Sequence, residues 1–201
     1  VNYQRILDST IARLSAEGKV PTLLLHSCCA PCSSYCLEYL SNYFHITVFY
    51  YNPNIYPAEE YAHRVAEQQN LIAQMPAKYP VSFIEDVNDP AVFYNMVSGY
   101  ESLKEGGARC FLCYEMRLRE TAMLAKKQNF DYFTTTLTLS PLKNSAKINE
   151  IGEKLSKEFD VNYLFSDFKK RGGYLRSIEL SKQYNLYRQN YCGCEFSQKF
   201  V

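Results

Sequence analysis

Short apolar or β-branched runs alternate with longer helical patterns along this chain, and this alternation constrains the fold more than any other feature. Five runs are typical of strands: residues 20–27, 45–51, 81–84, 131–136 and 162–166. Helical spacing of apolar residues predicts helices over 2–17, 33–44, 58–75, 110–128, 145–159 and 174–184. Residues 86–100 are predicted to form a helix or a helical loop that begins at Asp89-Pro90. Five strands separated by helices indicate an α/β protein with an open, mostly parallel sheet and helices on both faces.

Polar residues follow three of the predicted strands. Cys28 and Cys29 come after the first strand, Asn52-Pro53-Asn54 after the second, and residues 136–140 after the fourth. Because sites in open parallel sheets lie outside the carboxyl ends of the strands, we expect a cysteine-rich site at that edge. A chain of 201 residues is long enough for one domain with its own core, so the sequence predicts a single α/β domain over residues 1–201.

The eight cysteines form three compact groups, within residues 28–36, 110–113 and 192–194. A domain of this size buries roughly 70% of its unfolded surface and needs no disulfide bonds for stability. Closely spaced cysteines in such a chain indicate metal binding or redox chemistry in a reducing, cytoplasmic setting. Residues 1–5 open no hydrophobic targeting segment, and no apolar run approaches the ~18 residues of a membrane span, so no membrane partner is expected.

Two of the cysteine groups together can supply four metal ligands. Cys110-x-x-Cys113 places two thiols about one helical turn apart, so both can bind one metal ion or cluster. If Cys28 and Cys29 face the same crevice from the end of the first strand, the four thiolates would satisfy either Zn²⁺ or an iron-sulfur cluster. The sequence therefore predicts a metal centre at this edge of the sheet.

The remaining cysteines indicate redox work, because a closed zinc site would leave no thiol to react. Cys32 lies one helical turn after Cys28, where a helix N-terminus favours a thiolate. Cys36, on the next turn, fits a small buried core residue. Cys192-Gly193-Cys194 is the most specific group, because cysteines one residue apart form only a strained, easily reduced disulfide. This pair can store two electrons or provide two further metal ligands.

Charge gives little global attraction for nucleic acid, since 22 basic and 21 acidic residues leave a net charge of +1. One basic segment, Lys169-Lys170-Arg171, lies just before Tyr174. It predicts either a solvated helix start or a phosphate-binding surface with a tyrosine that can stack on a base. The turn after the first strand lacks the glycines of a nucleotide-binding loop, and Pro31 has no N–H to donate, so ATP chemistry is not expected.

Six motifs in series resemble the epoxyqueuosine reductase family of the QueH type. In chain order they are Cys28-Cys29-Ala30-Pro31-Cys32, Tyr51-Asn52-Pro53-Asn54-Ile55 with Glu60-Tyr61, Arg109-Cys110-x-x-Cys113, Thr134-Thr135-Thr136-Leu137 with Ser140-Pro141, Lys169-Lys170-Arg171 and Tyr191-Cys192-Gly193-Cys194. The resemblance covers nearly the whole chain. It implies a Rossmann-like sheet, similar to the adenine-nucleotide α-hydrolase-like folds, and a tRNA-modifying oxidoreductase. Such an enzyme reduces epoxyqueuosine in the tRNA anticodon to queuosine, the last step of queuosine biosynthesis.

The family pattern also implies roles for the cysteines. Four of them would hold a [4Fe-4S] cluster: Cys28, Cys29, Cys110 and Cys113. Removing the epoxide oxygen takes two electrons, whereas one such cluster ordinarily passes one, so a second redox store is expected in the Cys192/Cys194 pair. The catalytic candidates are Cys192, Cys194 and Cys32. The same three thiols could hold an additional mononuclear iron. Either that iron or an iron of the cluster would bind the epoxide oxygen as a Lewis acid.

Substrate contacts are expected from strand-end position and from charge. The predicted residues are Asn52, Asn54 and Thr135 for the pocket, and Lys169, Lys170, Arg171 and Tyr174 for the tRNA. The expected partners are a tRNA carrying epoxyqueuosine and an unidentified electron donor. Two other classes stay open: an iron-sulfur tRNA sulfur-transfer enzyme, which would need an ATP site, and a non-catalytic zinc-stabilised RNA-binding module.

Overall fold

A computed structural model describes residues 1–198 and contains one five-stranded sheet in which all strands are parallel. The strands are β1 (Thr22–His26), β2 (His45–Tyr50), β3 (Ser82–Glu85), β4 (Tyr132–Thr135) and β5 (Asn162–Tyr163). Their order across the sheet is β3-β2-β1-β4-β5. The predicted fold class, an open parallel α/β sheet of five strands, is confirmed.

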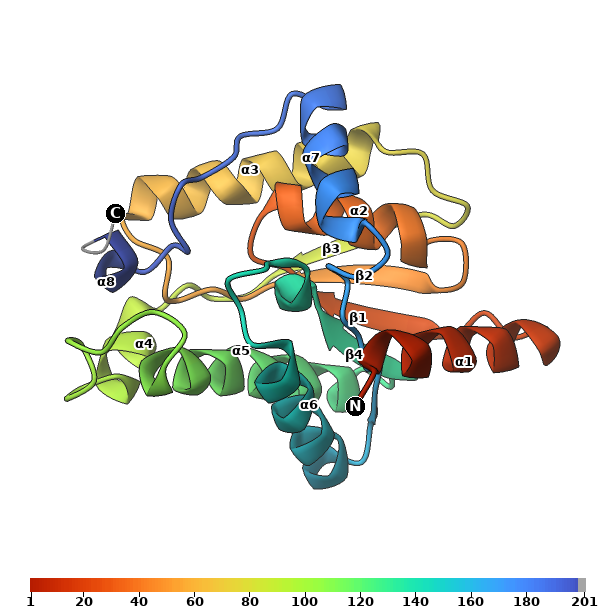
Figure 1. Ribbon diagram of the computed structural model, residues 1–201, viewed down its shortest axis with the longest axis horizontal. Coiled ribbons are helices and arrows are strands. Elements are labelled where there is room, and N and C mark those ends of the chain that lie inside the picture. The colour runs from red at the N-terminus through yellow and green to blue at the C-terminus, as the bar shows by residue number, and fades with distance from the viewer. Residues whose placement is uncertain (199–201) are drawn as a thin grey trace.

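Helices cover both faces of this sheet (Figure 1). They are α1 (Tyr3–Ala16), α2 (Ala30–Leu40), α3 (Ala58–Gln74), α4 (Pro90–Met96), α5 (Ala108–Lys127), the 3₁₀ helix η1 (Thr136–Leu139), α6 (Ser145–Phe159), α7 (Gly173–Gln183) and α8 (Glu195–Gln198). Figure 1 shows α2, α3 and α7 on one side of the sheet and α5 with α6 on the other. None of the helices among the described residues has the length and apolar character that a membrane crossing requires.

The central strand β1 is buried on both faces, as expected for a parallel sheet. Leu24 packs into the core on the α5 and α6 side, whereas Leu23 and Leu25 pack into the core on the α1 and α2 side. Side chains of successive strand residues point to opposite faces, which explains this division. All three leucines have no exposed surface.

The helix after β1 begins earlier than its apolar spacing predicts. α2 starts at Ala30 instead of residue 33, with Pro31 in its first turn, where a missing N–H costs no helical hydrogen bond. Cys29 is the N-cap residue and has an extended backbone. The early start therefore places Cys32 in the first helical turn, directly beside Cys28 and Cys29.

Other elements differ from the prediction in length. Within the helix or helical loop predicted over 86–100, α4 spans Pro90–Met96 and begins at Asp89-Pro90 as predicted, with Asp89 as the N-cap. Gly99 beyond it has a φ of +84°, a backbone conformation outside the helical region. The strand predicted over 162–166 contains two residues at the sheet edge. Residues 136–139 form η1, and α8 at 195–198 had no counterpart among the predicted elements.

The strand order reverses direction between β1 and β4, which are hydrogen-bonded neighbours. The chain leaves β1 toward β2 on one side, and later returns to β4 on the other side. The carboxyl ends of these two strands therefore have diverging connections and leave a crevice, the usual ligand position in open α/β sheets. The Cys28-Cys29 turn follows β1 at this point, and η1 follows β4.

Candidate functional site: a thiol-lined pocket at the end of β1

Three thiols converge at the turn between β1 and α2. The sulfur atoms of Cys28, Cys29 and Cys32 all lie within 4.8 Å of one another, and the Cys28 and Cys29 sulfurs are 3.9 Å apart. Cys28 and Cys29 are buried, and Cys32 is half-buried. We call this group the thiol triad. Three soft ligands at such separations are suited to binding one metal ion.

Charge within the thiol triad concentrates on Cys28. Hydrogen bonds from Cys29 and Cys32 stabilise the Cys28 thiolate and hold its pKa well below the ordinary value. The same bonds oppose ionisation of the donors, so the pKa of Cys29 rises to about 12 and that of Cys32 rises strongly. The triad therefore holds one negative charge more readily than two or three. A cation bound at this place would favour ionisation of the other two thiols as well.

A buried polar network supports the triad from below. His26 at the end of β1 bonds to the hydroxyl of Thr135 through Nδ1, at 2.9 Å, and contacts the Tyr51 carbonyl and Asn52 Oδ1 through Nε2, each at 3.2 Å. Asn52 donates to the carbonyl of Ser27 at 2.8 Å. Burial lowers the pKa of His26 to about 4, so the ring is neutral. The network ties the ends of β1, β2 and β4 together.

The second cysteine group sits on the first turns of α5. Cys110 and Cys113 are both buried, and the backbone N–H of Gly106 donates to Cys110 Sγ at 3.2 Å. Burial raises the pKa of Cys113 to about 12. Arg117, one turn further along, donates from Nε to the Cys113 carbonyl at 3.2 Å. Two thiols on adjacent turns thus face the same side of the helix, as the Cys-x-x-Cys spacing predicts.

The third group, Cys192 and Cys194, lies in the segment between α7 and α8 and meets both other groups. A small cavity is lined by cysteines from α5 and from this segment: Cys110, Cys113, Cys192 and Cys194. A larger pocket of about 430 Å³ is lined by Cys28, Cys32 and Cys192 among others. Among the described residues, Cys192 is the one that lines both spaces. All eight cysteines are free thiols.

Three arginines buried around these thiols are each only 1% exposed: Arg64, Arg109 and Arg117. Arg109 Nε and Nη2 and Arg117 Nη2 have no hydrogen-bond partner among the described residues. Arg109 and Arg117 both line the small cavity, and neither makes an ion pair with a carboxylate within residues 1–198. A buried guanidinium requires a nearby negative charge, and here the surrounding groups that can supply it are the cysteine sulfurs.

Arg64 on α3 holds the Cys192 segment in place. Its Nη1 donates to the Cys192 carbonyl at 3.1 Å, and its guanidinium lies over the ring of Tyr191. Its Nε pairs with Glu60 at 2.7 Å. Burial opposes the charge on Arg64, but Cys29 and Glu60 outweigh it and raise the pKa. Arg64 therefore fixes the Cys192 segment to α3 and interacts electrostatically with Cys29 of the thiol triad.

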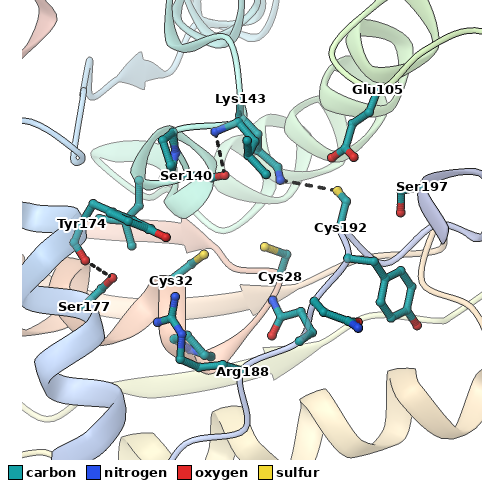
Figure 2. A pocket seen from close by; sticks show the side chains of 17 residues that line it. Cys28, Cys32, Glu105, Ser140, Lys143, Tyr174, Ser177, Arg188, Cys192 and Ser197 are labelled. Atoms are coloured by element: carbon teal, nitrogen blue, oxygen red, sulfur yellow. Dashed lines mark hydrogen bonds between the residues drawn. The ribbon is translucent and has the colours of Figure 1, made fainter. Parts of the chain in front are cut away.

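Figure 2 shows the larger pocket, with the sulfur atoms of Cys28, Cys32 and Cys192 directed into it. Lys143, on the turn after η1, donates from Nζ to Cys192 Sγ at 3.4 Å. Burial opposes its charge, but the nearby thiols, Cys192 first and then Cys28, raise the pKa of Lys143. Arg188 also lines the pocket, so thiols and two cations surround one space.

The predicted pocket residues occupy different positions. Asn52 and Thr135 belong to the buried network under the triad, with at most 1% of their surface exposed. Asn54 lines the small cavity, where its Oδ1 has no hydrogen-bond partner among the described residues. Tyr174 lines the larger pocket. Of these four residues, Tyr174 is therefore the one placed against the open space beside the thiol triad.

The basic segment before α7 is partly neutralised. Lys169 pairs with Asp167 at 2.6 Å, and Arg171 pairs with Asp8 at 2.6 Å. Lys170 is exposed and makes no ion pair within residues 1–198. Lys170 is therefore the cation of this segment with the greatest freedom to contact a phosphate.

Sequence reasoning missed Lys143 and Arg64. Lys143 lies two residues after the Ser140-Pro141 motif, so the motif itself was the available signal. Arg64 lies within a helical pattern, where an arginine is usually solvated, and nothing in the sequence distinguishes it from an exposed one. The place of both residues in the site follows from their contacts with Cys192, which is at least 49 residues away from each of them in sequence.

Comparison with known proteins gives a consistent result. The family model described as epoxyqueuosine reductase QueH matches residues 23–200. Epoxyqueuosine reductase QueH of Staphylococcus aureus is 45% identical over 98% of this chain and 84% of its own length. The enzymes of the same name from Streptococcus pyogenes and Thermotoga maritima are 42% and 37% identical, covering 99% and 88% of this chain and 79% and 90% of their own lengths. This match, in a chain that carries the thiol-lined pocket described above, shows that the chain belongs to the QueH family of epoxyqueuosine reductases.

Proposed function

We propose that this protein reduces epoxyqueuosine in tRNA to queuosine. In this reaction both carbon–oxygen bonds of the epoxide break, two electrons and two protons are consumed, and the products are an alkene and water. The observation that carries the proposal is a pocket of about 430 Å³ that opens onto Cys28, Cys32 and Cys192, in a chain of the QueH family. Because tRNA is the proposed substrate, we place the reaction in the cytoplasm.

We infer that a [4Fe-4S] cluster is held by Cys28, Cys29, Cys110 and Cys113. All four belong to one buried cluster of residues on the α5 side of the sheet. Their chemistry fits, because thiolates are the usual ligands of such clusters. The unpartnered guanidinium N–H groups of Arg109 and Arg117 fit as well, since a cluster with four thiolates is anionic. When bound, the cluster would supply electrons one at a time.

Cys192 and Cys194 would provide the second redox store. Oxidation of two thiols to a disulfide releases two electrons and two protons, which is the stoichiometry that epoxide removal needs. Cys192 supports this role by its position, since it lines both the substrate-sized pocket and the small cavity beside Cys110 and Cys113. An alternative use of the same thiols, together with Cys32, is to hold a mononuclear iron.

Side chains around the pocket suggest how the modified base is held. Tyr174 can stack on a base, and Arg188 can contact the ribose or a phosphate at the pocket mouth. Lys170 would contact the tRNA backbone nearby. An electron donor must restore the reduced state after each turnover. A zinc-stabilised RNA-binding module would bind its metal with cysteines but would give Cys192 and Cys194 no redox role, and the match to a family of reductases does not favour it.

The test begins with protein purified without oxygen. We expect about four irons with matching sulfide and a brown colour, and conversion of epoxyqueuosine to queuosine in tRNA when a low-potential reductant is added. Nucleoside analysis of tRNA from a strain lacking the gene should show accumulated epoxyqueuosine. Normal queuosine in such a strain, with no second reductase present, would overturn the assignment. Colourless protein with one zinc would favour the RNA-binding module.

A further inference from the structure

The pocket beside the thiol triad contains a cation, Lys143, to which the cysteine chemistry proposed above gives no role. Its Nζ lies 3.4 Å from Cys192 Sγ, and Figure 2 shows it directed into the space that Cys192 and Cys28 share. Lys143 is half-buried and is placed there by the turn that follows η1. The turn is closed by a backbone hydrogen bond from Lys143 to Ser140 at 3.2 Å.

Lys143 has no carboxylate partner among the residues that the structure describes. None of the ion pairs among residues 1–198 includes it. Glu105 lines the same pocket without forming an ion pair with Lys143. The side-chain partner that the structure gives Lys143 is a sulfur atom, which accepts hydrogen bonds only weakly. An ammonium group in this position has N–H donors free for an oxygen atom of a bound molecule.

Epoxide reduction creates a strong acceptor in this pocket. As the first carbon–oxygen bond breaks, electron density moves onto the oxygen, and with two electrons and two protons the oxygen leaves as water. A charged hydrogen-bond donor aimed at that atom stabilises the change, because the interaction strengthens as charge develops. The pocket offers two cations for this, Lys143 and Arg188.

Of the two cations, Lys143 has the better position. Arg188 Nη1 already donates to Ser181 Oγ at 3.1 Å, on the α7 side. Lys143 lies next to the sulfur atoms at which reduction would occur. Building on the proposed function, we propose that Lys143 binds the epoxide oxygen of the substrate and stabilises it as the carbon–oxygen bond breaks.

The experiment uses the enzyme with its full metal content and compares three variants with wild type. Lys143→Gln removes the charge, Lys143→Arg keeps it, and Lys157→Gln removes an exposed lysine of α6 that pairs with Glu153. Two quantities are measured for each: the rate constant for conversion of saturating epoxyqueuosine tRNA, and the ratio of affinities for tRNA carrying epoxyqueuosine and tRNA carrying queuosine. The second ratio reports contact with the epoxide oxygen without requiring turnover.

We expect Lys143→Gln to lower the rate constant by about 10²–10³-fold, the usual effect of losing one donor to a developing oxyanion. It should also lose about tenfold or more of the preference for the epoxide over the product, the range of a charged hydrogen bond. Lys143→Arg should recover part of both, and Lys157→Gln should match wild type. Recovery by arginine would show that a fold defect is not the cause.

Three results would count against the inference. A Lys143→Gln rate within a few-fold of wild type would refute it. An unchanged epoxide preference, combined with an altered rate of Cys192 alkylation by iodoacetamide, would show that Lys143 acts on the thiol and not on the substrate, and would also refute it. Wild-type enzyme that converts no epoxyqueuosine would overturn the proposed function itself, and this inference with it.

Discussion

Replacing Arg64 with methionine should destabilise the protein more than any comparable surface change. The guanidinium is 1% exposed, pairs with Glu60 at 2.7 Å and donates to the Cys192 carbonyl at 3.1 Å. Methionine fills similar volume but leaves the Glu60 carboxylate without its cation. Loss of one partner of a buried pair costs about 3–5 kcal/mol. Glu60 is 13% exposed and keeps a hydrogen bond from Tyr187, so we expect about 3 kcal/mol, the lower end of that range.

The assay is urea unfolding of protein with matched iron content, because a bound metal centre adds to apparent stability. In thermal unfolding of the same proteins, a loss of about 3 kcal/mol corresponds, for a chain of this length, to a melting temperature lower by about 6–12 °C. Removing the stranded charge as well, in the double variant Glu60→Gln with Arg64→Met, should restore part of the loss. Arg176→Met is the control, since Arg176 makes the same kind of pair with Glu38 on the surface.

The structure also predicts a change in the Cys192 segment of the Arg64→Met variant. Without the bond to its carbonyl, the segment should open more often, and iodoacetamide should alkylate Cys192 faster than in wild type. A stability loss in Arg64→Met no greater than in Arg176→Met, or a double variant less stable than Arg64→Met alone, would refute a buried charge pair between Arg64 and Glu60.

Three further predictions concern the dithiol, the packing of α7 and the pH dependence of stability. Cys192→Ser should keep the visible absorbance of the iron-sulfur centre while losing turnover; unchanged turnover would exclude the dithiol role. Gly173→Ala should lower stability in urea unfolding by about 3 kcal/mol or more, because the new Cβ would lie 1.9 Å from the Phe168 carbonyl oxygen, which is backbone and cannot move aside; wild-type stability would contradict the close packing. Lys154 and Arg119 lower the pKa of Glu115 below its ordinary value of 4.5, so its contribution to stability is present above that pH and is lost as the pH falls through the lowered pKa. Glu115→Gln should therefore lose less stability on acidification than wild type, and parallel pH profiles would contradict this.

Much of the fold could be read from local sequence signals. The alternation of strand and helix patterns identified all five strands, and the position of the cysteines after β1 predicted the edge of the sheet at which the thiol triad and the pocket lie. These signals depend on periodicity and on turn-forming residues, which act over a few residues. Lengths were less accurate: β5 has two residues where five were predicted. A strand at the sheet edge ends where its single neighbour stops pairing, which the sequence does not record.

The thiol site shows the same division. The sequence alone predicted metal or redox chemistry for the three cysteine groups, because a domain of this size needs no disulfide bonds and its cysteines are closely spaced. Only the tertiary structure decided that Cys192 lies between the thiol triad and the Cys110 pair, and that Lys143 and Arg64 both contact its segment. It also assigned Asn52 and Thr135 to a buried network. These contacts join residues far apart in the chain. They exist only because the reversal of strand order between β1 and β4 brings the turns that follow these strands close to the Cys192 segment.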